Sequence, residues 1–256
     1  MRLDVNCDLG EGETAGRTRA LMRWITSANV ASGGHAGNVA TMERCVELAK
    51  RFGIRLGAHP GPWGRRDFGR GPVRMDPDEL ELLLLQQVGA LERVARAHRM
   101  PLHHIKLHGS LYHASEQDAG LALRYARVVA RFWPRAIVYA RAGGRVGAVS
   151  RRAGLAVWEE AFADRGYRDD GTLVPRGGPG AVLDDVRLVV QRVRDLMGHG
   201  TVISVSGRPI RLQPRTVCIH SDTPHAVRLA RAVAAVISHD GWTRGGRAAG
   251  GVEGEG

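Results

Sequence analysis

The chain has 256 residues, of which 43% are hydrophobic, 5% aromatic and 25% charged. This composition excludes intrinsic disorder, a collagen helix and a coiled coil for most of the chain, and the length fits one large domain or two small ones. No run of 18 uncharged apolar residues occurs, and the first ten residues carry acids where a signal peptide needs a basic and then an apolar stretch. We therefore expect a cytoplasmic protein that does not enter a membrane.

Lysine and arginine outnumber aspartate and glutamate by 37 to 26, which gives a net charge of +11. Nearly all of the excess is arginine, because Lys50 and Lys106 are the only lysines. The arginines are scattered rather than gathered in one run, and few aromatic residues accompany them, so a nucleic-acid partner is not expected.

The three cysteines, Cys7, Cys45 and Cys218, lack metal-site spacing and are expected to be reduced thiols.

Short apolar runs typical of strands alternate with longer amphipathic runs typical of helices along the chain. Seven runs are predicted strands: Leu3–Leu9, Asn29–Ser32, Ile54–His59, His103–His108, Ala136–Ala140, Leu155–Ala161 and Thr216–His220. The predicted helices between them include Val39–Arg51, Asp78–Ala97, Ala119–Arg131, Asp184–Met197 and Pro224–Ser238. Repeated strand–helix units imply a parallel sheet, and no linker divides residues 1–244, so we predict one closed (β/α) barrel there. A doubly wound open sheet is the second possibility.

Local signals refine this prediction. Asp76 can cap the helix that follows it, with Pro77 in the first helical position and Glu79 completing a capping box. Residues 201–212 read as a hairpin inserted before the last strand, with its turn at Ser206 and Gly207. The glycine-rich tail, residues 245–256, is expected to be disordered and without function.

Ionisable residues alternate with apolar ones on three of the predicted strands. The three sets that share a face are Asp4, Asn6 and Asp8; His104, Lys106 and His108; and Cys218, His220 and Asp222. Strands between helices have both faces buried, so a row of ionisable side chains must contact water, a ligand or another such row. In the lumen of a barrel, the three rows can make these contacts. An exposed sheet edge and internal ion pairs are the alternatives, and ion pairing fits Asp4 and His104 best.

Polar residues also gather where the predicted strands end. They are Asp8, Glu11, His35, His59, Lys106, His108, Glu160, Asp164, His220 and Asp222. Because active sites of (β/α) barrels lie at the carboxyl ends of the strands, we predict a site there. Asp8, His35 and His59 have the ligand types of a single-metal site, although no HExxH or CxxC motif occurs and a histidine at a turn is more often a hydrogen-bonding residue than a ligand. Lys106 can pair with Asp8 or Asp4, hold a carboxylate or phosphate as a point charge, or have its pKa lowered for proton transfer.

Six strings in order resemble the LamB/YcsF family: VNCDLGEG, TSANVASGGHAGN, LGAHPG, HHIKLHGSLYH, EAFADRGYRDDGTLVPRGGPGAVLDD and VCIHSDTPHAV. The resemblance implies a distorted seven-stranded (β/α) barrel related to glycoside hydrolases and deacetylases. It also implies ATP-dependent hydrolysis of the lactam 5-oxoproline to glutamate, together with two partner subunits. The chain departs from the family pattern at Asn38, where the family has aspartate, and in a shortened, basic stretch after Gly12.

With this resemblance, the ten strand-end residues receive expected roles. Asp8, His59, Lys106, His108 and Glu160 are expected to be catalytic, with Asp8 or His59 as the base for water and Lys106 and His108 neutralising the developing oxyanion or phosphate. Glu11, His35, Asp164, His220 and Asp222 are expected to bind substrate; His220 and Asp222 can orient each other or contact it separately. No Walker sequence occurs, so ATP can be bound by, or shared with, the partner subunits.

Two other functions stay open on the sequence. The first is a metal-dependent hydrolase or deacetylase of an N-acylated sugar, with Asp8, His35 and His59 as ligands. The second is a non-catalytic subunit that binds a small carboxylate.

Overall fold

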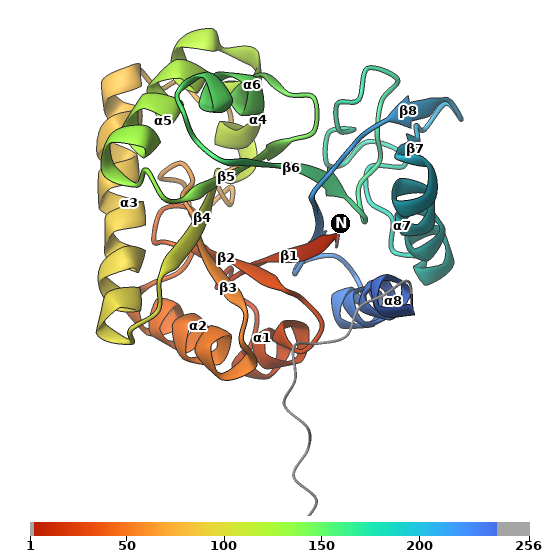
Figure 1. The fold of residues 1–256 in the computed structure, drawn as a ribbon, viewed down its shortest axis with the longest axis horizontal. Helices are drawn as coiled ribbons and strands as arrows, with labels where there is room; N and C mark the ends of the chain where they lie inside the picture. The colour runs from red at the N-terminus through yellow and green to blue at the C-terminus, as the bar shows by residue number, and fades with distance from the viewer. Residues whose placement is uncertain (1–2, 240–256) are drawn as a thin grey trace, which may run out of the picture.

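The computed structural model of the chain describes residues 3–239. Seven parallel strands close into a barrel in the order β1-β2-β3-β4-β5-β6-β9 (Figure 1). They are β1 (Asp4–Leu9), β2 (Ser27–Ala31), β3 (Arg55–His59), β4 (Leu102–Lys106), β5 (Ile137–Arg141), β6 (Val157–Phe162) and β9 (Thr216–His220). The prediction of one closed seven-stranded barrel is therefore confirmed, and the doubly wound sheet is wrong.

Helices surround this ring of strands. They are α1 (Ala15–Met22), α2 (Val39–Phe52), α3 (Pro77–Ala97), α4 (Gly109–Gln117), α5 (Ala119–Phe132), α6 (Arg145–Arg152), α7 (Val186–His199) and α8 (Ala226–His239). Their apolar faces pack on the outward side chains of the strands, so the main hydrophobic core lies between the two layers. No described helix has the length and apolar character needed to span a bilayer.

The helix boundaries follow from capping. Asp76 accepts hydrogen bonds from the backbone of the first turn of α3, and Glu79 bonds back to the Asp76 backbone, which confirms the predicted capping box. Asn38 caps α2 in the same way. Asparagine and aspartate are equally good at this position, so the departure from the family pattern at residue 38 leaves the helix start intact.

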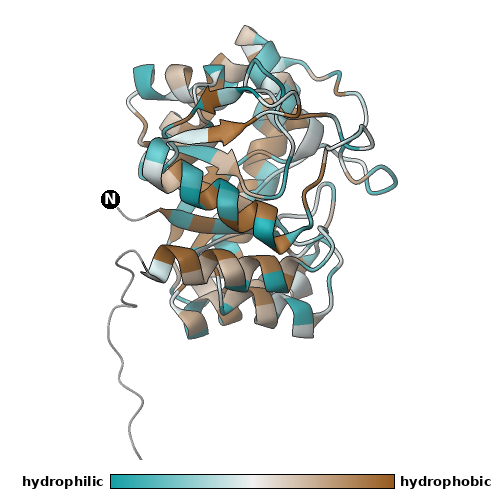
Figure 2. Cartoon of the chain, turned by 90° about the vertical axis from the view of Figure 1, so that its right-hand side faces the viewer, coloured by the Kyte–Doolittle hydropathy of each residue, from teal (hydrophilic) through white to brown (hydrophobic). Residues whose placement is uncertain are grey.

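The barrel closes through pairing of its first and last strands. Asp4 of β1 pairs in register with Thr216 of β9, and Asp8 pairs with His220. This register brings residues more than 200 positions apart to the same level of the lumen. The carboxyl ends of all seven strands therefore meet at one mouth of the barrel, from which the long loops extend, opposite the N-terminus (Figure 2).

Before the last strand the chain leaves the barrel. The strands β7 (Thr201–Ile203) and β8 (Pro209–Arg211) form an antiparallel pair, which confirms the predicted hairpin. Asp185 caps α7, as its position before an amphipathic run indicated. The predicted disordered tail lies outside the described residues.

Candidate active site

The lower layer of the lumen, at the amino ends of the strands, is a closed polar network. The buried Asp4 carboxylate accepts hydrogen bonds at 2.5, 2.7, 2.6 and 3.1 Å from, in order, Thr26, Ser27, Thr216 and Arg55. His104 bonds Asn29 at 2.7 Å and stacks on Tyr139. Burial holds the pKa of His104 well below its ordinary value. These groups satisfy one another, so this layer stabilises the barrel.

Lys106 holds a buried positive charge above that layer. Its Nζ lies 2.9 Å from Asp8 Oδ1 and 2.9 Å from Glu160 Oε1, and it donates to Asn6 Oδ1 at 3.3 Å. Burial alone would lower the pKa of this ammonium group, but Asp8, Cys218 and Glu160 raise it well above the ordinary value. Lys106 is therefore charged, and it also donates to Cys218 Sγ at 3.2 Å, so its three hydrogen bonds go to Asp8, Asn6 and Cys218.

Asp8 connects this ion pair to two histidines. Its Oδ2 lies 3.4 Å from His59 Nε2 and 3.9 Å from His220 Nε2. Burial would raise the pKa of Asp8, but the positive charges of His59 and Lys106 hold it well below the usual range. In turn, Asp8 raises the pKa of His59 against the opposing effect of burial. Asp8 is thus a carboxylate of low basicity.

Asp164 and His220 form a second pair. Asp164 Oδ1 lies 2.9 Å from His220 Nδ1, while Oδ2 accepts from the His220 backbone N–H at 2.8 Å and from Thr223 Oγ1 at 2.6 Å. Burial would raise the pKa of Asp164, but His220 and these hydrogen bonds lower it. Because a carboxylate only accepts, His220 Nδ1 donates its hydrogen to Asp164, and Nε2 lies 3.9 Å from Asp8 Oδ2, beyond hydrogen-bond distance.

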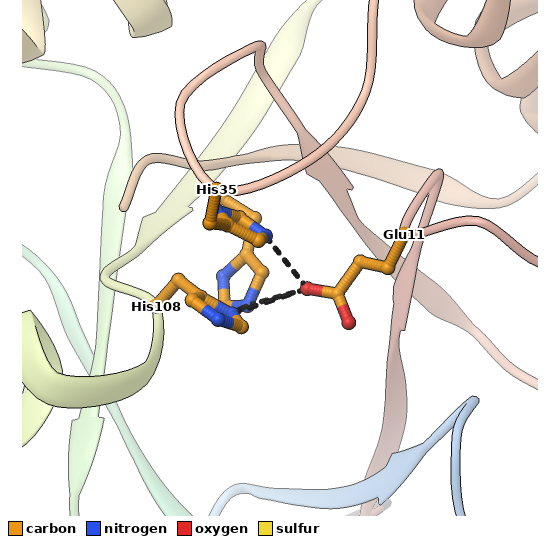
Figure 3. Close-up of side chains that lie close together, drawn as sticks. Glu11, His35 and His108 are labelled. Atoms are coloured by element: carbon orange, nitrogen blue, oxygen red, sulfur yellow. Dashed lines mark hydrogen bonds and ion pairs between the residues drawn. The ribbon is translucent and has the colours of Figure 1, made fainter. Parts of the chain in front are cut away.

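Four residues at the mouth form what we call the histidine–glutamate cluster: Glu11, His35, His59 and His108. Glu11 Oε1 lies 2.8 Å from His35 Nε2, 3.1 Å from His108 Nδ1 and 3.6 Å from His59 Nε2. Figure 3 shows Glu11 facing His35 and His108, whose rings stack with 3.5 Å between their centroids. His108 Nδ1 also lies 3.0 Å from His59 Nε2. The four donor atoms lie within 4.8 Å of one another, a geometry that can hold a divalent metal ion.

Burial and the neighbouring groups both shift the pKa values of this cluster. Burial lowers the pKa of His35 to about 4, and it also lowers the pKa of His108. For Glu11, burial acts in the opposite direction, but hydrogen bonds from His108 and His35 hold its pKa below the usual range. The cluster therefore combines a carboxylate with two imidazoles whose pKa values are lowered, His35 and His108, and one whose pKa is raised, His59.

A pocket of about 830 Å³ opens over these groups. Its lining includes Asp8, His59, Lys106, His108 and His220 from the site and the arginines Arg70, Arg141, Arg165, Arg168 and Arg176. The Asp222 carboxylate lies 2.7 Å from Arg70 and 3.1 Å from Arg176 and so links two of the loops beside the pocket. The arginines give the pocket a surplus of positive charge, which suits an anionic ligand.

The structure brings nine of the ten predicted site residues into one buried network and leaves Asp222 partly exposed at its edge. The hypothesis that His220 and Asp222 orient each other is wrong, because Asp164 holds His220 and the arginines hold Asp222. The three metal-ligand candidates also divide between two groups. His35 and His59 belong to the histidine–glutamate cluster, whereas Asp8 lies with Cys218 and His220 in a second group of three ligating side chains.

Some residues that position the site could not be found from the sequence. Glu13 accepts hydrogen bonds from the backbone N–H groups of Gly10 at 2.7 Å and Glu11 at 2.9 Å, and so fixes the loop that aims Glu11 inward. Tyr112 donates to Glu160 at 3.1 Å. Glu13 follows the string VNCDLGEG, and Tyr112 lies within HHIKLHGSLYH, but neither string indicates a contact with the Glu11 loop or with Glu160, so only the folded chain reveals these roles.

A closed parallel barrel with acids and histidines gathered at the carboxyl ends of its strands defines a (β/α)-barrel protein whose candidate site lies where such barrels carry their active sites. More specifically, the chain belongs to the LamB/YcsF family, whose sequence model matches residues 3–249.

Relatives support this assignment over almost the full length. The chain is 40% identical over 244 residues to the 5-oxoprolinase A subunit of Thermococcus onnurineus, covering 94% of this chain and 96% of the relative. It is 42% identical over 247 residues to the 5-oxoprolinase A subunit of Rhodopseudomonas palustris, covering 95% of this chain and 97% of the relative. Among solved structures, it is similar to the lactam utilization protein from Thermus thermophilus, with a TM-score of 0.87 and 35% identity. The match covers 94% of this chain and 98% of that structure.

Proposed function

We propose that this chain is the lactam-hydrolysing subunit of a 5-oxoprolinase, which opens 5-oxoproline to glutamate at the expense of ATP together with partner subunits. The names of relatives at about 40% identity point to this substrate and to a multi-subunit enzyme. The structural observation that carries the proposal is the Asp164–His220 pair, whose free ring nitrogen faces Asp8 at the floor of the arginine-lined pocket.

The chemistry of the substrate explains the need for ATP. A five-membered lactam resists water because amide resonance protects its carbonyl carbon. Transfer of the γ-phosphoryl group of ATP to the amide oxygen releases ADP and makes that carbon electrophilic. Water then adds to the carbon, the ring nitrogen leaves with a proton, and a second water releases phosphate from the resulting acyl phosphate to give glutamate.

His220 is our candidate for the general base that activates the first water. Its Nδ1–H is held by buried Asp164, so its Nε2 can accept a proton, and a positioned base of this type contributes roughly 10²–10⁴-fold to rate. Asp8 and His59 fit this role less well than the sequence suggested. Asp8 is neutralised by Lys106, while the Nε2 of His59 faces His108 and Glu11.

The other groups of the pocket act through charge. Lys106 pairs with two carboxylates, Asp8 and Glu160, and so orders the floor of the pocket without leaving a surplus of positive charge there. The positive charge that stabilises negative charge on the reacting carbonyl must then come from the pocket arginines. Arg70, Arg165 and Arg176 line the same pocket and can bind the substrate carboxylate or a phosphoryl group in the bidentate manner typical of arginine. We propose that ATP itself is bound by, or shared with, the partner subunits.

The proposal is tested with the intact complex. The chain is produced with the partner subunits, and glutamate and ADP are measured from 5-oxoproline and ATP. We expect ATP-dependent glutamate formation that falls by at least about 100-fold in His220→Gln. The matched control is His199→Gln, which replaces an exposed histidine at the end of α7 and should keep full activity.

Two results would reject the assignment. If the folded complex forms no glutamate while the isolated chain still binds 5-oxoproline tightly, the chain is a non-catalytic carboxylate-binding subunit. If glutamate forms at the same rate in His220→Gln and in the control, the active centre lies elsewhere.

A further inference from the structure

Two backbone carbonyls fix the ring orientation and the tautomer of two histidines in the histidine–glutamate cluster. His59 Nδ1 lies 2.8 Å from the carbonyl oxygen of Lys106, and His108 Nε2 lies 2.8 Å from the carbonyl oxygen of Phe68. A carbonyl oxygen accepts and never donates, so each of these ring nitrogens carries its hydrogen. In the neutral rings, the opposite nitrogens, His59 Nε2 and His108 Nδ1, then bear lone pairs.

These two lone-pair nitrogens point at each other. They lie 3.0 Å apart in a buried site, a separation that repels two lone pairs unless a positive charge sits between them. Glu11 Oε1 adds a third electron-rich atom, 3.1 Å from His108 Nδ1 and 3.6 Å from His59 Nε2. The arrangement therefore requires a cation at its centre, either a shared proton or a metal ion.

His35 completes the set. Its Nε2 lies 2.8 Å from Glu11 Oε1, and its side chain is fully buried against the stacked ring of His108. Its other nitrogen, Nδ1, has no hydrogen-bond partner among the described residues, so the ring is aligned by packing and by its contact with Glu11. Four donors, three nitrogen and one oxygen, thus converge from four separate loops or strand ends.

We propose that Glu11, His35, His59 and His108 bind one divalent transition-metal ion of the Zn²⁺ type. Imidazole and carboxylate are the ligands that such ions prefer, and backbone carbonyls commonly orient metal-bound histidines through the second ring nitrogen. Four of the six distances between donor atoms are 2.8–3.6 Å, and all six are within 4.8 Å, so side-chain movements bring the four atoms around an ion with bonds of about 2.0–2.1 Å. His59 and His108 line the pocket, so an oxygen entering there would reach such an ion as a fifth ligand, and the ion would then supply Lewis-acid polarisation.

The site differs from the triad expected from the sequence, because Asp8 is replaced by Glu11 and His108 is added. Asp8 does not belong to this group of converging donors, and its Oδ1 pairs with Lys106 at 2.9 Å. The proposal does not depend on the identity of the substrate, and its test reads metal binding rather than turnover.

The experiment uses the full chain, stripped of metal with a chelator and titrated with Co²⁺ and then Zn²⁺. We expect one ion per chain, a Co²⁺ absorption spectrum typical of nitrogen and oxygen ligands, and its displacement by Zn²⁺. Glu11→Gln and His108→Ala should each weaken binding by at least about 10-fold. Two controls, His220→Ala in the second group of ligating side chains and His199→Ala on the surface, should bind the ion normally.

A measurement on the unaltered chain guards against variants that fail to fold. The ring ¹⁵N resonances of Zn²⁺-loaded protein should report coordination through Nε2 of His59 and Nδ1 of His108. Absence of stoichiometric binding, or a proton still shared between these two nitrogens at saturating Zn²⁺, overturns the proposal. So does binding that survives in His108→Ala but is lost in His220→Ala, which would assign the ion to Asp8, Cys218 and His220. None of these results alters the outcome of the glutamate assay.

Discussion

Lys106 and Lys50 are the only lysines of the chain, and they occupy opposite environments. Lys106 is buried between Asp8 and Glu160, whereas Lys50 is exposed on α2 and donates to the backbone of His98. Removal of the Lys106 charge leaves two carboxylates buried without their cation. The same substitution at Lys50 removes one surface hydrogen bond.

We predict that Lys106→Met lowers the free energy of unfolding by about 3–5 kcal/mol, the usual effect of breaking a buried ion pair. Lys50→Met should change it by less than about 0.5 kcal/mol. Urea unfolding followed by circular dichroism measures both. Equal effects of the two substitutions would mean that Lys106 is not held as an ion pair in solution.

Asp164 acts through His220 and is a positioning residue. In Asp164→Asn the amide can turn its NH₂ toward His220 Nδ1 and favour the tautomer with hydrogen on Nε2, which cannot accept a proton from water. We predict a fall in kcat of about 10²-fold with KM nearly unchanged, and a shift in the pH at which kcat reaches half its maximum. A pure loss of stability, with normal kcat per folded molecule and an unchanged pH profile, would contradict this role.

The alternation of side chains along strands was enough to predict that Asp8, Lys106 and His220 share the lumen, because period two and burial allow no other placement. The partners of these residues could not be predicted. Which acid meets His220 depends on how the segment after β6 folds back, and that segment supplies Asp164. The orientation of Glu11 similarly depends on hydrogen bonds to Glu13 within one loop.

At the level of elements, β3 makes room for the lumen with a glycine. A β-carbon at Gly57 would lie 2.1 Å from Nε2 of His104, whose ring fills the space. Gly89 in α3 has no atom within 4 Å of the corresponding position. These two glycines therefore offer a matched comparison of the same substitution.

We predict that Gly57→Ala destabilises the fold by at least about 1–3 kcal/mol, because His104 must leave its stacked position on Tyr139. Gly89→Ala should instead stabilise it by up to about 1 kcal/mol, since alanine favours a helix. Thermal unfolding of the two variants provides the measurement. A stable Gly57→Ala protein would show that the lumen is more loosely packed than described.

The strands and long helices were predictable because each carries a clear period of two or of 3.6 residues. The short helices α1, α4 and α6 have only eight or nine residues and give too few repeats for such a pattern. The predicted end of one strand was also wrong. The predicted strand His103–His108 ends at Lys106, so that His108 stands at the N-cap position of α4 without a side-chain capping bond and can turn toward the mouth of the barrel.

For the molecule as a whole, the buried histidines link stability to pH. Burial lowers the pKa of His104 well below its ordinary value of about 6.5, so the unfolded chain binds a proton more readily than the folded chain. The contribution of His104 to the free energy of unfolding is therefore fully present above about pH 6.5 and is lost as the pH falls below it. The lowered pKa of His103, to about 4, acts in the same direction, while the raised pKa of His59 opposes it.

We predict that the urea midpoint of the chain falls steadily between about pH 7 and about pH 4.5 at constant ionic strength. Below about pH 4, protonation of Asp8 and Asp164, whose folded pKa values are lowered, should accelerate the loss. A midpoint that stays constant or rises over this interval would indicate that these side chains reach solvent in the native state.

Pairing of β1 with β9 has a consequence for biosynthesis. Asp8 leaves the ribosome early, but its neighbour His220 is made more than 200 residues later, after the β7–β8 hairpin. Contacts of such long sequence separation form slowly, and a nascent chain that stops before β9 leaves the barrel with two open strand edges. An incomplete product therefore has no assembled reaction centre, and its unpaired edges expose it to proteolysis and to aggregation.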